Sequence, residues 1–316
     1  MREEVVLFVG DALAKYGFPA GHPLSVDRQA AFWSAAQQQK LHRRAAVRDP
    51  RAATRAELER FHTAQHVSRV EACSNAGEGY LDYGDTPAFP GVFDAGATVA
   101  GTALEGLERI MAGQAMKTFQ PIGGLHHARR GQAAGFCVFN DLGVVIETLQ
   151  THFGVDRIAY VDIDVHHGDG VFYSYESDPG LTVVDIHESG HFLYPGTGHA
   201  GETGRGAAEG TKLNLPLNPG AGDRDFFAAW ERGLEQLRAC APQFVILQCG
   251  ADSLLGDPLA DLQLTPAAHG RVTRDLVRLA NETAKGRMMV FGGGGYDLTN
   301  LAAAWTRVLA ELLGGS

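Results

Sequence analysis

The sequence predicts an α/β fold: a single three-layer domain with a mostly parallel central sheet. Short β-branched runs alternate with longer amphipathic segments along the 316 residues, as expected when each strand is followed by a covering helix. Hydrophobic residues make up 45% of the chain and charged residues 20%, which is typical of a globular protein with a sizeable core. No linker, repeat or low-complexity tract interrupts the alternation, so residues 1–316 are expected to form one domain.

The first half of the chain carries one strong local signal and one long loop. Thr54 and Glu57 have the spacing of a capping box, so a helix is expected to begin there and run toward Phe61. Residues 74–91 are rich in Gly, Asp, Tyr and Pro and predict a surface loop of a length that is often functional. The remaining predicted elements are a strand at 5–9, a helix at 26–41, a short helix after Ala64 and a helix at 93–112.

The second half alternates strand and helix without a break. A strand at 118–122 is followed by a loop over 123–135 that carries several polar residues. Further strands are expected at 158–161, 181–186, 213–217, 244–249 and 288–291, and helices at 141–153, 223–240, 266–284 and 298–313.

Charge and cysteine content exclude several classes of protein. The net charge of -10 and the lack of a basic arm argue against a nucleic-acid-binding protein. The four cysteines contain no CxxC spacing, so neither a zinc finger nor a disulfide framework is indicated. No segment approaches the eighteen apolar residues of a membrane span, and the apolar run at 5–9 is too short for a signal peptide. A cytoplasmic location without a membrane partner is the expectation.

One stretch, residues 161–170, packs three carboxylates and two imidazoles together. If it continues the preceding strand, Asp162, Asp164 and His166 point to the same face, because strand side chains alternate. An Asp and a His two residues apart can bind one divalent cation, since carboxylate oxygen and imidazole nitrogen are both zinc ligands. The alternative is a polar strand end in solvent, which the density of metal-competent groups disfavours.

Polar groups follow five predicted strands, and sites in α/β sheets form at these carboxyl ends. A catalytic zinc site takes three protein ligands and keeps one position open. Asp252, at the end of the 244–249 strand, is the best third ligand beside Asp164 and His166; the alternative is a helix cap. The polar groups of the five strand ends are His126 and His127; Asp162, Asp164, His166, His167 and Asp169; Asp185 and His187; Asp252; and Tyr296.

The adjacent His126 and His127 cannot both project in one direction from an extended chain, so they suit proton transfer better than metal binding. Buried acids such as Asp162 and Asp169 would orient the two rings and raise their basicity. Tyr296 follows four glycines and stays protonated at neutral pH, so it can donate to a developing oxyanion. Its alternative role is that of a turn tyrosine packed on the surface.

Together these motifs resemble the histone deacetylase superfamily, which has an arginase-like α/β fold. Within that superfamily, GHPL at 21–24, HESG at 187–190 and YPGTG at 194–198 look most like the bacterial acetoin-utilization-type deacetylases. The motifs that carry the resemblance are GGLHHA at 123–128, GFC at 135–137, DIDVHHGDG at 162–170, GAD at 250–252 and GGGGY at 292–296.

The resemblance implies a role for each site residue. Asp164, His166 and Asp252 would bind Zn²⁺ or Fe²⁺, with His127 as general base, His126 as its electrostatic partner and Tyr296 polarising the substrate carbonyl. Asp162 and Asp169 would support the two histidines. The substrate channel would include Phe136, Tyr194, Leu259 and, as a clamp on the substrate backbone, Asp85; a structural K⁺ would lie among Asp162, Asp164, His166, Asp185 and Ile186, although Asp185 stands where a small hydroxyl residue is common.

The implied reaction is metal-dependent hydrolysis of acyl-lysine, with N-ε-acetyl-lysine in proteins or peptides as the expected substrate. An acetylpolyamine amidohydrolase is the main alternative, although Leu125 replaces the Pro that usually precedes the His pair in that branch. A binuclear ureohydrolase would need more bridging acids. A non-catalytic binding protein would be expected to have lost Tyr296 or a metal ligand.

Overall fold

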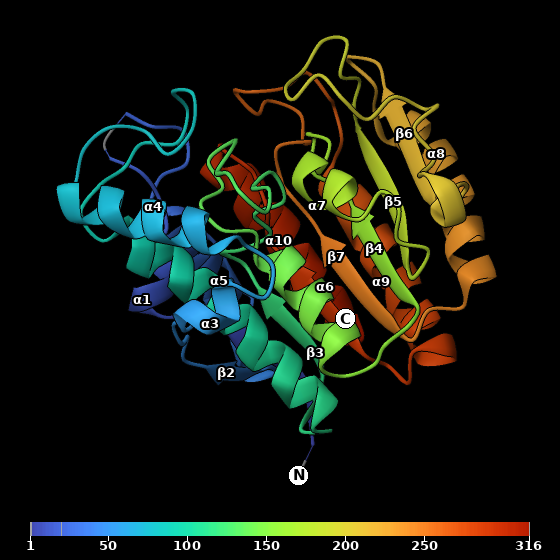
Figure 1. The fold of residues 1–316 in the computed structure, drawn as a ribbon. Helices are drawn as coiled ribbons and strands as arrows, with labels where there is room; N and C mark the ends of the chain where they lie inside the picture. Colours follow the sequence, from blue (N-terminus) through green and yellow to red (C-terminus); the bar gives the residue numbers. More distant parts are fainter. Residues whose placement is uncertain (1, 20, 316) are drawn as a thin grey trace.

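The computed structural model describes residues 2–19 and 21–315. Over these residues the strands form one eight-stranded sheet in the order β2-β1-β3-β8-β7-β4-β5-β6, and every pairing is parallel. This arrangement, visible in Figure 1, confirms the α/β fold and makes the sheet wholly rather than mostly parallel. The strands are β1 (Glu3–Phe8), β2 (Ala46–Arg48), β3 (Ala115–Gln120), β4 (Ile158–Asp162), β5 (Leu181–Glu188), β6 (Lys212–Leu217), β7 (Phe244–Gln248) and β8 (Met288–Phe291).

Helices cover both faces of the sheet. In Figure 1, α5 and α6 lie in front of the strands, while α9 and α10 lie behind them. Because both faces are covered, the central strands β4 and β7 are buried along their whole length and read as nearly continuous apolar runs. The helices are α1 (Asp11–Ala14), α2 (Arg28–Gln38), α3 (Arg55–Leu58), α4 (Ala64–Ala76), α5 (Val92–Met111), α6 (Asp141–Thr151), α7 (Asp169–Ser174), α8 (Asp223–Cys240), α9 (Pro266–Thr283) and α10 (Leu298–Leu312).

The most regular elements match their predictions closely. The amphipathic segment 223–240 is helix α8 with the same bounds, and the capping box of Thr54 and Glu57 opens α3. Helix α4 continues to Ala76, so the long loop begins at Gly77 rather than at residue 74. The short elements β2, α1 and α7 were not predicted, because three to six residues are too few to show a hydrophobic period.

The strand predicted at 158–161 is β4, but it does not continue through residues 163–166, as the same-face argument assumed. β4 ends at Asp162, and the next residues follow bends rather than an extended strand. The N–H of Val165 bonds the carboxylate of Asp252 (3.0 Å), and the N–H of His166 bonds Asp164 Oδ1 (3.0 Å). Carboxylates, rather than the carbonyls of a neighbouring strand, therefore accept these backbone N–H groups. The expectation that Asp162, Asp164 and His166 share one face of a strand was wrong.

Among the described residues, no helix has the length and apolar character needed to cross a membrane.

Candidate active site

Three metal-competent side chains converge at the carboxyl ends of β4 and β7. Asp164 and His166 come from the bends after β4, and Asp252 comes from the turn after β7. One ligand atom from each lies within 4.8 Å of the others. His166 Nδ1 is 3.1 Å from Asp164 Oδ1 and 3.2 Å from Asp252 Oδ2, and all three residues are buried. The structure thus brings together the three residues predicted as metal ligands.

The three side chains fit a divalent cation on the evidence of their own chemistry. Asp252 Oδ2 is buried without a hydrogen-bond partner, which is costly for a carboxylate unless a cation satisfies it. Burial, together with the charge of Asp164, raises the pKa of Asp252 to about 7. Two carboxylates and one imidazole are donors that suit zinc or ferrous iron. We conclude that Asp164, His166 and Asp252 form a metal site.

Two glycines allow the backbone to pass close to these carboxylates. A Cβ at Gly250 would lie 2.1 Å from Asp164 Oδ2, and a Cβ at Gly294 would lie 2.1 Å from Asp252 Oδ2. Both distances are far inside van der Waals contact, so no other residue fits at either position without displacing a ligand. The glycines of the GAD and GGGGY motifs are therefore part of the site's geometry.

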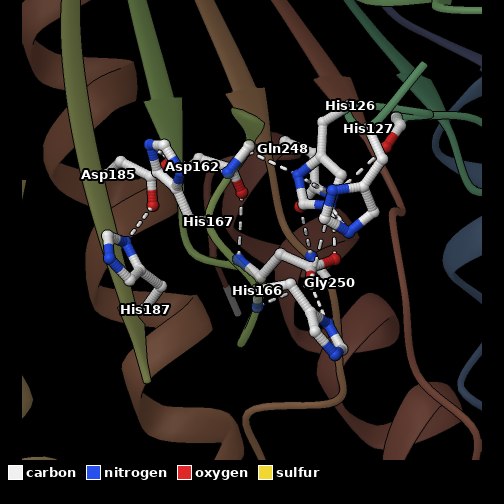
Figure 2. Close-up of polar contacts among 12 residues, drawn as sticks. His126, His127, Asp162, His166, His167, Asp185, His187, Gln248 and Gly250 are labelled. Atoms are coloured by element: carbon white, nitrogen blue, oxygen red, sulfur yellow. Dashed lines mark hydrogen bonds and ion pairs between the residues drawn. The ribbon is translucent and has the colours of Figure 1, made fainter. Parts of the chain in front are cut away.

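His126 and His127 lie side by side next to the metal site, as Figure 2 shows. The two Nε2 atoms are 3.1 Å apart. The sequence argument that adjacent histidines diverge was wrong, because the chain turns at these residues instead of continuing extended. The carboxylate predictions hold in geometry: Asp162 Oδ2 lies 2.8 Å from His126 Nδ1, and Asp169 Oδ1 lies 2.7 Å from His127 Nδ1.

The partners of the two rings assign their protons. Each Nδ1 faces a carboxylate and must carry hydrogen, so a hydrogen bond between the two Nε2 atoms needs one further proton, which makes one of the two rings an imidazolium. Burial lowers the basicity of His126, but Asp162 and Asp164 outweigh it and raise the pKa of His126 to about 10. Burial and the neighbouring His126 lower the pKa of His127 to about 4. At neutral pH, His126 is the charged member of the pair and His127 the neutral one.

Two side chains that the sequence analysis did not single out hold this arrangement. Gln248, the last residue of β7, donates from Nε2 to Asp164 Oδ2 (2.8 Å) and accepts the N–H of Gly250 (2.8 Å), and Figure 2 shows it pointing toward the histidine pair. Asp141 accepts the N–H groups of Gly124 and Leu125 at 2.8 and 2.7 Å, which fixes the turn before His126. The sequence did carry a signal for Gln248, because it is a polar residue at the end of an apolar strand. For Asp141 the sequence indicated only the start of a helix.

Tyr296 is reached by the four-glycine segment after β8. Its backbone N–H bonds Asp257 Oδ2 (2.8 Å), and burial with the nearby Asp252 raises the pKa of the Tyr296 phenol well above its ordinary value. The hydroxyl therefore stays protonated. The buried Arg28 of α2 holds the same segment, because its guanidinium donates to the carbonyls of Gly293 and Gly295 (2.5 and 3.0 Å). Sequence reasoning missed Arg28, since a charged residue at a helix start normally lies in solvent.

Of the residues predicted to form a substrate channel, Phe136 and Tyr194 lie next to Tyr296 and His127. Phe136 lies with its ring centroid 5.9 Å from that of Tyr296, and Tyr194 with its centroid 5.1 Å from that of His127. Asp85 is on the exposed loop after α4 and lines, with Tyr194, an outer pocket of about 370 Å³. Leu259 is half-buried, and its N–H bonds Asp257, the residue that also holds Tyr296.

The residues predicted around a structural cation come from two neighbouring strands: Asp162, Asp164 and His166 lie at and after the end of β4, whereas Asp185 and Ile186 lie in β5. Asp185 was expected at a strand end but falls inside β5, where it is the register partner of Asp162. Both carboxylate oxygens of Asp185 are engaged: one lies 2.6 Å from His187 Nδ1 and the other accepts the N–H of Gly168 (2.9 Å). Figure 2 shows Asp185 between His167 and His187.

Comparisons with known proteins agree with this geometry. A family model described as the histone deacetylase domain matches residues 22–312. The acetoin utilization protein AcuC of Bacillus subtilis is 32% identical over 99% of this chain and 83% of its own length. Histone deacetylase 8 of Xenopus tropicalis is 33% identical over 84% of this chain and 72% of its own length.

Solved structures give the same result. The crystal structure of the HDA15 HD domain superposes with a TM-score of 0.91 at 30% identity, covering 99% of this chain and 89% of that one. The match spans the sheet and the segments that carry the metal site. This chain belongs to the histone deacetylase family.

Proposed function

We propose that this protein hydrolyses the amide bond of N-ε-acyl-lysine, with acetyl-lysine in proteins or peptides as the main substrate. One observation carries the proposal: Asp164 and His166 of the buried metal site, the histidine pair and Tyr296 all line a single cavity. These are the groups that amide hydrolysis needs, namely a cation site, a base and an oxyanion donor. We also propose that residues 1–316 act as one domain, because Arg28 from the first part of the chain bonds the carbonyls of Gly293 and Gly295 from the last part.

A divalent cation held by Asp164, His166 and Asp252 would supply Lewis acidity, which polarises an amide carbonyl and makes water more acidic. The remaining chemistry belongs to the chain. The Tyr296 hydroxyl, kept protonated by its buried setting, donates a hydrogen bond to the carbonyl oxygen as negative charge develops there. The four-glycine segment, fixed by Arg28, holds the tyrosine in position.

His127 acts as the base. Its Nδ1 hydrogen is held by Asp169, so its Nε2 is the atom that accepts the proton of the attacking water. The same Nε2 then returns a proton to the departing lysine amine, which leaves as the free side chain together with acetate. The charge on His126, supported by Asp162, stays beside the reaction and stabilises the developing oxyanion.

Zinc is the proposed cation, with ferrous iron as the alternative. We also propose a structural K⁺ among Asp162, Asp164, His166, Asp185 and Ile186. The concentration of buried carboxylates supports it, since burial raises the pKa of Asp162 to about 6 and Asp185 adds to that rise. Because both oxygens of Asp185 already have partners, a cation there would have to share them.

The test is a panel of acyl-lysine peptides and acetylated polyamines assayed with zinc and with iron. Acetyl-lysine peptide should be turned over with release of acetate, and N-acetylputrescine should be a poorer substrate. A reversed preference would favour the acetylpolyamine alternative. Tight binding of acetyl-lysine peptide by the metal-loaded protein without acetate release would instead indicate a non-catalytic binding protein.

A further inference from the structure

The cavity beside the metal site is small. It measures about 20 Å³ and its apolar lining comes from Leu24, Leu125 and Cys137. A space of roughly 10–15 Å³ on this scale is needed for one water, so the cavity has room for about one methyl-sized group. Under the proposed function, the amide carbonyl lies between the metal site and Tyr296, and the alkyl end of the acyl group must occupy this space.

Leu24 is held in that lining by His22. The backbone N–H of Leu24 donates to Nδ1 of the His22 ring (3.1 Å), while Nε2 of the same ring donates to the carbonyl of Asp85 (3.1 Å). The partners fix the tautomer, with the hydrogen on Nε2. His22 thus connects the segment that carries Leu24 to the exposed loop that carries Asp85.

The His22 ring also packs against the channel wall. Its centroid lies 4.5 Å from that of Phe136 and 4.5 Å from that of Phe18, so the imidazole contacts both aromatic rings. Phe136 has a φ of 68°, which a bulky residue adopts only when its surroundings enforce it.

Both backbone groups of Phe136 are bound by side chains from other segments. Tyr16 donates its hydroxyl hydrogen to the Phe136 carbonyl (2.7 Å), and the Phe136 N–H donates to Thr86 Oγ1 (3.1 Å). These two bonds fix the backbone, but neither contacts the Phe136 ring. The ring itself packs against three side chains, Tyr296, Phe18 and His22, of which His22 is the nearest, with a centroid distance of 4.5 Å.

We propose that His22 is a positioning residue that sets acyl-chain selectivity, because one imidazole bonds Leu24, which lines the acyl cavity, and packs against Phe136 next to Tyr296. It touches neither the metal ligands nor the histidine pair. Removing the His22 side chain enlarges the space available to the acyl group and leaves the metal ligands and the histidine pair in place. The inference rests on the proposed deacylase function.

The experiment compares the full-length, zinc-loaded protein with its His22→Ala variant on peptides that carry acetyl-, propionyl-, butyryl- or hexanoyl-lysine. One extra methylene in a confined apolar pocket is worth about tenfold or more in discrimination. We expect the butyryl-to-acetyl ratio of kcat/KM to rise at least about tenfold in His22→Ala, with unchanged zinc content. His22→Phe keeps an aromatic ring but loses both hydrogen bonds, and should shift the ratio in the same direction by less.

His42→Ala is the matched control, since His42 also packs on an aromatic ring, Trp33, but lies away from the cavity. It should leave the ratio unchanged. If His22→Ala does not fold, His22→Phe decides alone. A folded His22 variant with the wild-type acyl profile would overturn the inference.

Failure of the proposed function is a separate result, seen as no turnover of any acyl peptide by the wild-type protein. The inference is then decided by binding, using fluorescence anisotropy of labelled acetyl- and butyryl-lysine peptides. A rise in relative butyryl affinity in His22→Ala supports it, and an unchanged ratio refutes it.

Discussion

The floor of the site and its rim are held in different ways. The floor, formed by the metal ligands and the histidine pair, is buried, and its carboxylates contact imidazole rings or backbone N–H groups within the site. The rim, formed by Tyr83, Asp85 and Tyr194, lies on loops, with Tyr83 98% exposed and Tyr194 44% exposed. A rigid floor suits chemistry that is common to many substrates, whereas an exposed rim suits the recognition of a particular one. Substitutions should therefore change turnover at the floor and substrate preference at the rim.

The largest effect is expected from Asp252→Ala. The variant loses one of three cation ligands and leaves His166 beside a single carboxylate, so both metal and turnover should be lost, by about 10³-fold or more in kcat/KM. Metal analysis and acetate release measure the two losses. Asp156→Ala, an exposed acid remote from the site, is the control and should behave as wild type. Retained activity would remove Asp252 from the site.

Tyr296→Phe should lower kcat by about 10²–10³-fold while metal content and unfolding temperature stay unchanged. The substitution removes only the hydroxyl that donates to the developing oxyanion. Tyr80→Phe, at an exposed position, serves as the control. A Tyr296→Phe variant with near-wild-type turnover would contradict the proposed mechanism.

A graded loss is expected along the chain of contacts that runs from His127 to the rim. Asp169 bonds His127 with one oxygen and Arg129 with the other (2.8 Å), and the Arg129 side chain is half exposed. Asp169→Asn should cost about 10–100-fold in kcat, and Arg129→Gln less than about tenfold, as judged from the usual effect of residues that orient a ligand or base. Equal losses in the two variants would mean that Arg129 belongs functionally to the floor.

Low pH should destabilise the folded protein through the buried side chain of His62. His62 is buried, accepts the N–H of Asn140 (2.9 Å) and has its pKa lowered to about 3 by burial and by His66. In the unfolded chain His62 takes up a proton near pH 6.5, whereas in the native protein it does so only near pH 3. The contribution of His62 to the free energy of unfolding is therefore complete above pH 6.5 and is lost progressively as the pH falls toward 3. Between pH 7 and pH 5 this amounts to on the order of 2 kcal/mol. Urea unfolding of His62→Gln should show a shallower pH dependence over the same interval, and an unchanged slope would contradict this assignment.

The smallest effect is expected at the rim. Asp85→Asn should raise KM several-fold with kcat nearly constant, because an exposed clamp contributes to substrate binding equally before and during the reaction. Asp94→Asn, another exposed acid, is the control. A fall in kcat without a change in KM would place Asp85 with the floor and weaken the distinction between the two regions.

The sequence predicted the floor better than the rim, for a physical reason. The metal ligands lie in short motifs whose residue types restrict the chemistry, so Asp164, His166 and Asp252 were identifiable from residue type and spacing alone. The contacts that hold these ligands link distant positions, as when Gln248 bonds Asp164 across 84 residues, and no local pattern reports such a partner. The turn that brings His126 and His127 together depends in the same way on Asp141.

In the fold, too, local patterns were predictable from the sequence and contacts between distant residues were not. Helix α8 was predicted to the residue, because eighteen positions display its amphipathic period. The assumed continuation of β4 to His166 was wrong, since a contact from the Asp252 carboxylate interrupts the strand there and leaves no trace in the apolar pattern. The roles of Leu259 and Asp85 remain predictions, because substrate contacts decide them.

The bonds from Arg28 to Gly293 and Gly295 also bear on the order in which the protein is assembled during synthesis. They join residues 265 and 267 positions apart, and contacts of such separation form late because a long loop must close first. A chain emerging from the ribosome can complete the metal ligands once Asp252 is available, but Arg28 waits for the final strand and the glycines that follow it. The proposed active site is therefore complete only after nearly the whole chain has been made, since even the metal ligand Asp164 accepts the N–H of Gly294.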